Sequence, residues 1–140
     1  MEITNNAVQT VAVNQNVLLT DTVVSGNCSI VHRSGSGLVT LRGLTNNQCR
    51  ARFRVTFGAN IAVPTGGTAE AISLAITING EGVATTTMIT TPAAVLEYNN
   101  VFSSIFLDVP RGCCSQISVK NISTQAINVQ NANLIIERVA

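Results

Sequence analysis

The stretch Cys49-Arg-Ala-Arg-Phe-Arg-Val-Thr-Phe57 decides the fold class, because apolar and polar residues alternate through it without a break. Side chains of a β-strand point alternately to the two faces of a sheet. One face of this strand is therefore apolar and is expected to enter the core: Ala51, Phe53, Val55 and Phe57. The opposite face carries three guanidinium groups: Arg50, Arg52 and Arg54.

Similar β-rich segments cover the rest of the chain, and turn-forming residues separate them. The Asn79-Gly80 pair is the clearest hairpin signal, because both residues tolerate the positive φ of a type I′ turn. About ten strands are predicted: Ala7–Val13, Asn16–Val24, Cys28–His32, Leu38–Arg42, Cys49–Ala59, Ala71–Ile78, Val83–Ile89, Val95–Val109, Ser115–Asn121 and Ala126–Val139. No segment has a helical pattern, which favours an antiparallel sandwich or barrel over a parallel sheet with crossover helices.

Length and composition indicate one domain that assembles with partners. The 140 residues are 46% hydrophobic, 4% aromatic and 11% charged, so the core must consist of aliphatic side chains. The charged fraction is about half the usual share, which favours a surface that is covered in part by other subunits. We expect a single domain over residues 1–140, with residues 1–15 as an N-terminal arm or edge strand.

The sequence offers no catalytic cluster and predicts no cofactor. The single histidine, His32, has no acid or nucleophile at a motif spacing, and the seven acidic residues are scattered singly. The nucleophile elbow G-x-S-x-G and the phosphate-binding glycine motifs do not occur. We therefore expect a protein that is not an enzyme.

Four cysteines, Cys28, Cys49, Cys113 and Cys114, leave three alternatives open. No C-x2-C pair is present, and adjacent cysteines on a strand point to opposite faces, which disfavours a zinc site. Disulfides, within the chain or to a neighbouring subunit, are the favoured reading. Reduced structural thiols are the alternative for a chain that stays in a reducing compartment.

Binding to nucleic acid and to membranes is disfavoured. A formal charge of +1 gives no basic footprint for nucleic acid, and no apolar run reaches the length of a membrane-spanning helix. The first ten residues lack the features of a signal peptide. The stripe Arg50, Arg52 and Arg54 is a candidate face for an anion or sugar, against the alternative of a simply solvated strand face. The sequons at Asn27 and Asn121 are interpreted as accidental.

Two strands are apolar on both faces, which is typical of a strand buried once in the core and again against a neighbouring subunit. These strands contain Ser103–Val109 and Asn133–Ala140. The alternative is coverage by a loop of the same chain. The predicted subunit interface comprises Ile105, Leu107, Leu134, Ile135, Ile136, Glu137 and Val139.

Four segments in this order, VPTGG, ISLAITINGEGV, SSIFLDVP and the terminal NANLIIERVA, resemble bacterial and phage members of the tumour-necrosis-factor and complement globular-head superfamily. The resemblance runs from about Val17 to Ala140 and includes in particular the C-terminal domains of exosporium collagen-like glycoproteins. The resemblance implies a TNF-like jelly roll of about ten antiparallel strands, a tight homotrimer and a display role. The collagen-like stalk of that family is absent from this sequence.

We therefore expect a homotrimeric structural module on the surface of a particle or cell, such as a phage head fibre or decoration protein, a spore layer or an extracellular layer. Further self-assembly or docking on a capsid or spore surface would follow from that role. The alternative is a lectin-like adhesin that binds a glycan through the arginine stripe or the loop Thr65–Thr68. One histidine cannot supply the metal cluster of a cupin-type enzyme.

Overall fold

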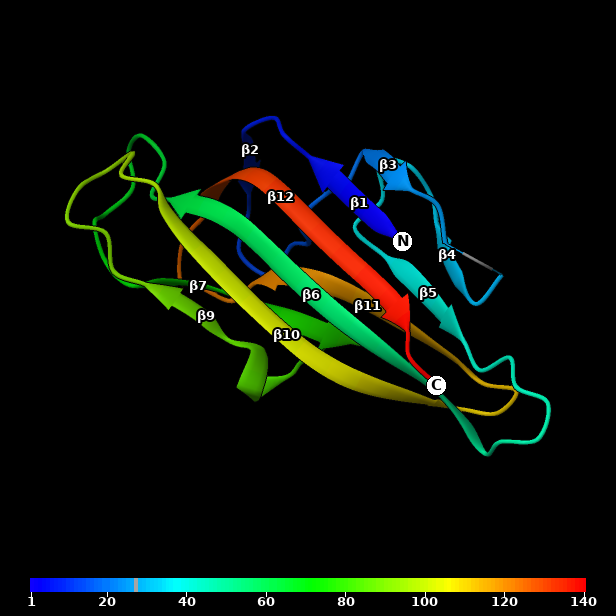
Figure 1. Ribbon diagram of the computed structural model, residues 1–140. Coiled ribbons are helices and arrows are strands. Elements are labelled where there is room, and N and C mark those ends of the chain that lie inside the picture. The colour runs from blue at the N-terminus through cyan, green and yellow to red at the C-terminus, as the bar shows by residue number, and fades with distance from the viewer. Residues whose placement is uncertain (27) are drawn as a thin grey trace.

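The structure is a computed structural model that describes residues 1–26 and 28–140. It contains two antiparallel sheets packed face to face, which confirms the predicted all-β jelly-roll sandwich (Figure 1). The strands and the single 3-10 turn among the described residues are β1 (Glu2–Asn5), β2 (Gln9–Val11), β3 (Asp21–Val24), β4 (Ile30–His32), β5 (Val39–Arg42), β6 (Arg50–Ala62), β7 (Ile72–Ile78), β8 (Glu81–Gly82), η1 (Ala84–Thr86), β9 (Met88–Thr90), β10 (Asn99–Pro110), β11 (Cys114–Asn121) and β12 (Ile127–Arg138).

The first sheet has the strand order β10-β6-β12-β1-β3, with β2 also paired to β12. The second sheet has the order β4-β5-β11-β7-β8, with β9 paired to β7. In Figure 1 the strands β10, β6, β12 and β1 form the layer nearest the viewer, and β11, β7 and β9 lie behind them. No described helix is long and apolar enough to cross a membrane.

The apolar face of the strand around Phe53 is buried, as predicted. The four apolar side chains of this stretch are fully buried and belong to one aliphatic cluster between the sheets: Ala51, Phe53, Val55 and Phe57. Phe53 and Phe57 are the largest fully buried side chains of the described residues. Long pairing of β6 with β10 on one side and β12 on the other fixes which residues of those two strands face outward.

The Asn79-Gly80 hairpin is also as predicted. Asn79 has φ 52° and Gly80 has φ 89°, and Ile78 pairs with Glu81 across the turn. Both residues of the turn thus have the positive φ of a type I′ hairpin, which matches the right-handed twist of the flanking strands.

The N-terminal half differs from the predicted strands. Residues 2–5, expected in an arm or edge strand, form β1, which lies inside the first sheet between β12 and β3. In the predicted strand Asn16–Val24, only the last four residues form β3. Val17 and Leu19 are nevertheless buried, because this segment enters the core as a loop.

Candidate functional site

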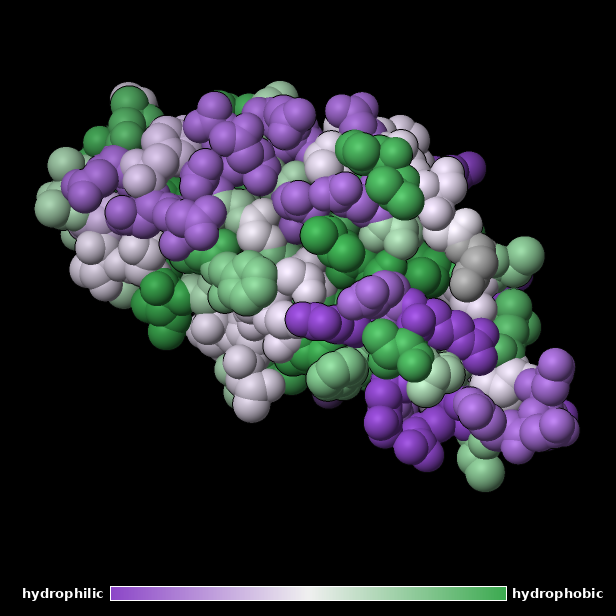
Figure 2. All heavy atoms as spheres, viewed as in Figure 1, coloured by the Kyte–Doolittle hydropathy of each residue, from purple (hydrophilic) through white to green (hydrophobic). Residues whose placement is uncertain are grey.

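The candidate site is the outer face of the first sheet, defined here as the outward side chains of β10, β6, β12 and β1. Phe102 and Phe106 project from β10 and each is 65% exposed. Ile135 on β12 is 40% exposed and lies opposite Thr56 of β6, so it shares the face with both rings. Figure 2 shows hydrophobic side chains in the middle of this face, with hydrophilic ones among them and on either side.

Strand register explains why these rings face outward. Phe106 pairs with Arg54, and Leu107 pairs with the buried Phe53. Directly paired residues of antiparallel strands share a face. Leu107 is therefore on the core side with Phe53, and Phe106 is on the outer side with Arg54.

Two of the seven predicted interface residues must be corrected, whereas the prediction of Ile105 and Leu107 stays a prediction. Leu134 is 1% exposed and Ile136 is 0% exposed, and both belong to the core of their own chain. Ile105 and Leu107 are half-buried and pack against the same core. On β10 these two residues lie on the core side, while Phe102 and Phe106 lie on the outer side.

The three remaining interface residues, Ile135, Glu137 and Val139, are exposed as the prediction requires. Sequence reasoning missed Phe102 and Phe106. The signal that could have identified them is the pairing of β10 with β6, since the orientation of β6 was already clear from its own alternation.

A hollow of about 290 Å³ opens on this face beside Phe102. Gly58 forms part of its floor, where a Cβ atom would lie 3.8 Å from the carbonyl oxygen of Val101 and 3.9 Å from the Phe102 ring. A side chain at position 58 would therefore project into the hollow. Its polar lining consists of Thr56, Asn60, Asn100, Asn131 and Asn133.

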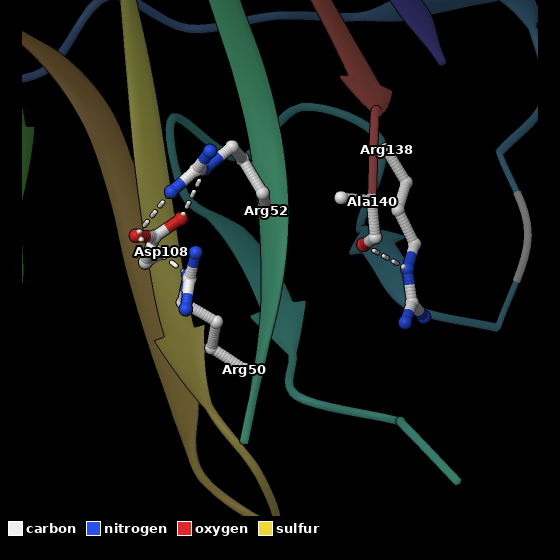
Figure 3. A network of polar contacts seen from close by, with 5 residues as sticks. All are labelled: Arg50, Arg52, Asp108, Arg138 and Ala140. Carbon is white, nitrogen blue, oxygen red and sulfur yellow. Dashed lines mark hydrogen bonds and ion pairs between the residues drawn. The ribbon is translucent and has the colours of Figure 1, made fainter. Parts of the chain in front are cut away.

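The arginine stripe is on the outer face but is paired with acids (Figure 3). Arg52 Nε donates to Asp108 Oδ1 at 2.8 Å and its Nη2 donates to Oδ2 at 3.1 Å. Arg50 Nε lies 3.1 Å from Asp108 Oδ2, and Arg54 Nη1 lies 3.7 Å from Glu137 Oε1. The hydrogen bond from Arg52 holds the pKa of Asp108 below its usual value, with smaller contributions from the charges of Arg52 and Arg50. The stripe is therefore not a row of three unpaired cations.

The predicted disulfides are not confirmed, because all four cysteines have free, exposed thiols. Strand pairing explains part of this result. Cys114 pairs with Arg42 on one side of β5, while Arg42 N donates to the carbonyl oxygen of Ser29, next to Cys28, on the other side. Cys114 and Cys28 are therefore separated by two strand spacings, or about 10 Å. A disulfide requires Cα atoms within about 7 Å of each other. No group of three His, Cys, Asp or Glu side chains suited to a metal occurs in the part of the chain that the structure describes.

His32 and the sequons have structural explanations where they can be described. His32 Nε2 lies 2.9 Å from the carbonyl oxygen of Ser36, so the ring is fixed to the turn that follows it. Asn121 is fully buried and its amide donates to the carbonyl oxygens of Val11 and Gln125. Asn27 lies outside the described residues.

Comparison with solved structures identifies the fold. The globular domain of zebrafish complement 1qA protein matches with a TM-score of 0.64 at 10% identity, over 99% of this chain and 97% of that one. Murine APRIL matches with a TM-score of 0.68 at 11% identity, over 99% and 98%. A CBM35 domain of Cellvibrio japonicus Abf62 reaches a TM-score of only 0.44 at 11% identity, over 100% and 98%, too low to support an argument about sugar binding.

No protein-family model and no curated protein matches the chain. The structural matches share few residues with it, so they establish the fold alone. The chain has the TNF-like jelly-roll fold of the complement globular domain and APRIL, as the sequence resemblance predicted.

Proposed function

We propose that this protein is a non-enzymatic structural module that forms a homotrimer through the outer face of its first sheet. We propose further that the trimer is displayed on the surface of a particle or cell, such as a phage head, a spore or an extracellular layer. The observation that carries the proposal is the pair of exposed rings, Phe102 and Phe106, on one sheet face.

The exposed apolar area of this face is concentrated in two aromatic side chains. A phenylalanine that exposes 65% of roughly 200 Å² leaves about 130 Å² of ring in water. Two such rings and Ile135 lie on one face, and the largest exposed apolar patch of a monomer is often a functional surface. Aromatic residues are enriched in the cores of protein interfaces, where they exclude water.

The arrangement of charge around the patch supports a self-contact. Arg54 is paired with Glu137 at one side of the rings, and Asn133 Nδ2 donates to Glu2 Oε2 at 3.0 Å on the other. The charged groups Arg54, Glu137 and Glu2 therefore already have partners, and little uncompensated charge would be buried when copies meet. The superfamily resemblance implies threefold closure of such a contact.

An aspartate at position 135 tests the proposal. In the trimer, Ile135→Asp would bring three carboxylates together in a dry contact, each losing several kcal/mol of hydration. The matched control is Ile89→Asp, because Ile89 is 65% exposed on β9 of the other sheet. Sedimentation equilibrium should give one chain for Ile135→Asp and three for the control, with unchanged circular dichroism. Three chains for Ile135→Asp would contradict the proposal.

Display on a particle is tested separately by the genes that flank this one. Capsid, tail or spore-layer genes on both sides would support it. A position inside a metabolic operon would contradict it without affecting the trimer.

A lectin-like module is a second candidate because of the hollow beside Phe102. Its four asparagine amides could bind sugar hydroxyls while the ring stacks on a sugar face. Glycan-array binding by the wild-type protein that is lost in Gly58→Val, which fills the hollow, would favour this candidate.

A further inference from the structure

The charges of this protein are separated along its length. Five arginines, Arg42, Arg50, Arg52, Arg111 and Arg138, and a single acid, Asp108, occupy one end of the sandwich, which we call the basic end. Its formal charge is +4. The remainder of the chain holds three basic and six acidic residues, a formal charge of −3. The net charge of +1 is therefore the sum of a strongly positive end and a negative remainder.

Hydrogen bonds and ion pairs connect the members of the basic end. Arg50 and Arg52 share Asp108, and Arg111 N donates to the carbonyl oxygen of Cys49, the neighbour of Arg50. Residue Ser29 joins the other two arginines: its carbonyl accepts from Arg42 N and its hydroxyl accepts from Arg138 Nη1. Five residues that are up to 96 positions apart in sequence thus gather around one end of the fold.

The surface at this end is concave. A hollow of about 330 Å³ is lined by Asn47, Gln48, Cys49, Arg50, Arg52 and Ala140. It adjoins a second hollow of about 500 Å³ that shares three of these residues and reaches Arg138. Figure 3 shows Arg50 and Arg52 directed toward Asp108 on β10, and Arg138 beside Ala140, apart from them. Clefts lined by one sign of charge focus the electrostatic field on an oppositely charged partner.

We propose that the basic end is a docking surface for an acidic polypeptide segment. Arg42 and Arg111 are exposed and form no ion pair with any residue that the structure describes. The Arg52–Asp108 pair shows that this surface holds a carboxylate by two parallel hydrogen bonds, the geometry in which arginine binds carboxylates.

A polypeptide partner fits this end better than nucleic acid does. Segments 42–52, 108–114 and 138–140 contain no aromatic residue on which a base could stack. The same end also carries Cys49, Cys113 and Cys114, all exposed. Exposed thiols are uncommon in soluble proteins, and a docked partner would cover them.

The test measures binding of fluorescent poly-L-glutamate by anisotropy. The variant is Arg42→Glu with Arg111→Glu, and the control of equal net charge is Arg33→Glu with Lys120→Glu, which lie outside the basic end. At about 20 mM salt, where exposed charges are weakly screened, the variant should bind about tenfold more weakly than wild type, and the control less than twofold. Raising the salt to about 150 mM should abolish most of the difference.

Docking should also slow the alkylation of Cys49 by a maleimide. Equal losses of affinity in variant and control would overturn the proposal, because net charge alone would then explain binding. Tighter binding of single-stranded DNA than of poly-L-glutamate would overturn the choice of partner. The same binding measurement is repeated with the Ile135→Asp protein. Binding should be retained there, since the basic end does not depend on the trimer.

Discussion

Removal of the two exposed rings by Phe102→Ala with Phe106→Ala should dissociate the assembly without destabilising the chain. Each ring leaves about 130 Å² in water in the isolated chain. At about 25 cal/mol per Å², complete coverage of one ring contributes up to about 3 kcal/mol per subunit. Full coverage of both rings would contribute about 6 kcal/mol per subunit. If only a quarter of this is realised, the rings contribute about 1.5 kcal/mol per subunit and about 4.5 kcal/mol per trimer. That loss raises the dissociation constant by about a thousandfold.

The assay is sedimentation velocity over a dilution series, with thermal unfolding of each protein. Exposed substitutions typically change the free energy of unfolding by less than about 0.5 kcal/mol, so the isolated chain should keep its stability. Ile89→Ala is the control, because it removes an equally exposed side chain from the second sheet. If the double variant keeps the three-chain mass at dilutions where wild type also keeps it, the outer face of the first sheet is not the interface.

Three further predictions concern the core, the ion pairs and the thiols. Phe57→Ala should lower the free energy of unfolding by about 3–5 kcal/mol in denaturant titration, because Phe57 is fully buried; a loss below 1 kcal/mol would contradict its place in the core. Asp108 has a lowered pKa through the hydrogen bond from Arg52, so its stabilising contribution is present above the usual value of 3.8 and is lost as pH falls through the lowered pKa. The difference in melting temperature between wild type and Asp108→Asn should therefore shrink below pH 3.8, and a difference that stays constant there would argue against the pair. All four thiols should react with Ellman's reagent in the native state, since all are exposed; fewer than four would restore the disulfide prediction.

The sequence predicted those parts of the fold that depend on residues close to one another in the chain. The alternation through Phe57 determines the orientation of β6, and the Asn79-Gly80 pair determines a hairpin, because each depends on residues close in sequence. The position of β1 inside the first sheet could not be predicted in the same way. Its four residues, Glu2–Asn5, carry little pattern of their own, and their pairing with β12 joins residues more than 120 positions apart.

The sequence predicted an interface on the segments that form β10 and β12, but it did not identify Phe102 and Phe106 as their exposed rings. Ile135 and Ile136 were both predicted at the interface, but β12 alternates, and only Ile135 of the two is exposed. On β10 both faces are apolar, so alternation alone could not distinguish Phe106 from Leu107. That choice depends on pairing with β6 across the sheet. The clustering of arginines at the basic end depends likewise on which strand ends and loops meet, which no local pattern reports.

The mass of the wild-type protein in solution tests the central claim most directly. Light scattering coupled to size-exclusion chromatography measures this mass without a variant or a label. A value close to three times the 14.7 kDa chain mass, constant over a tenfold range of concentration, is the predicted result. A single species of one chain mass over the same range would contradict the account.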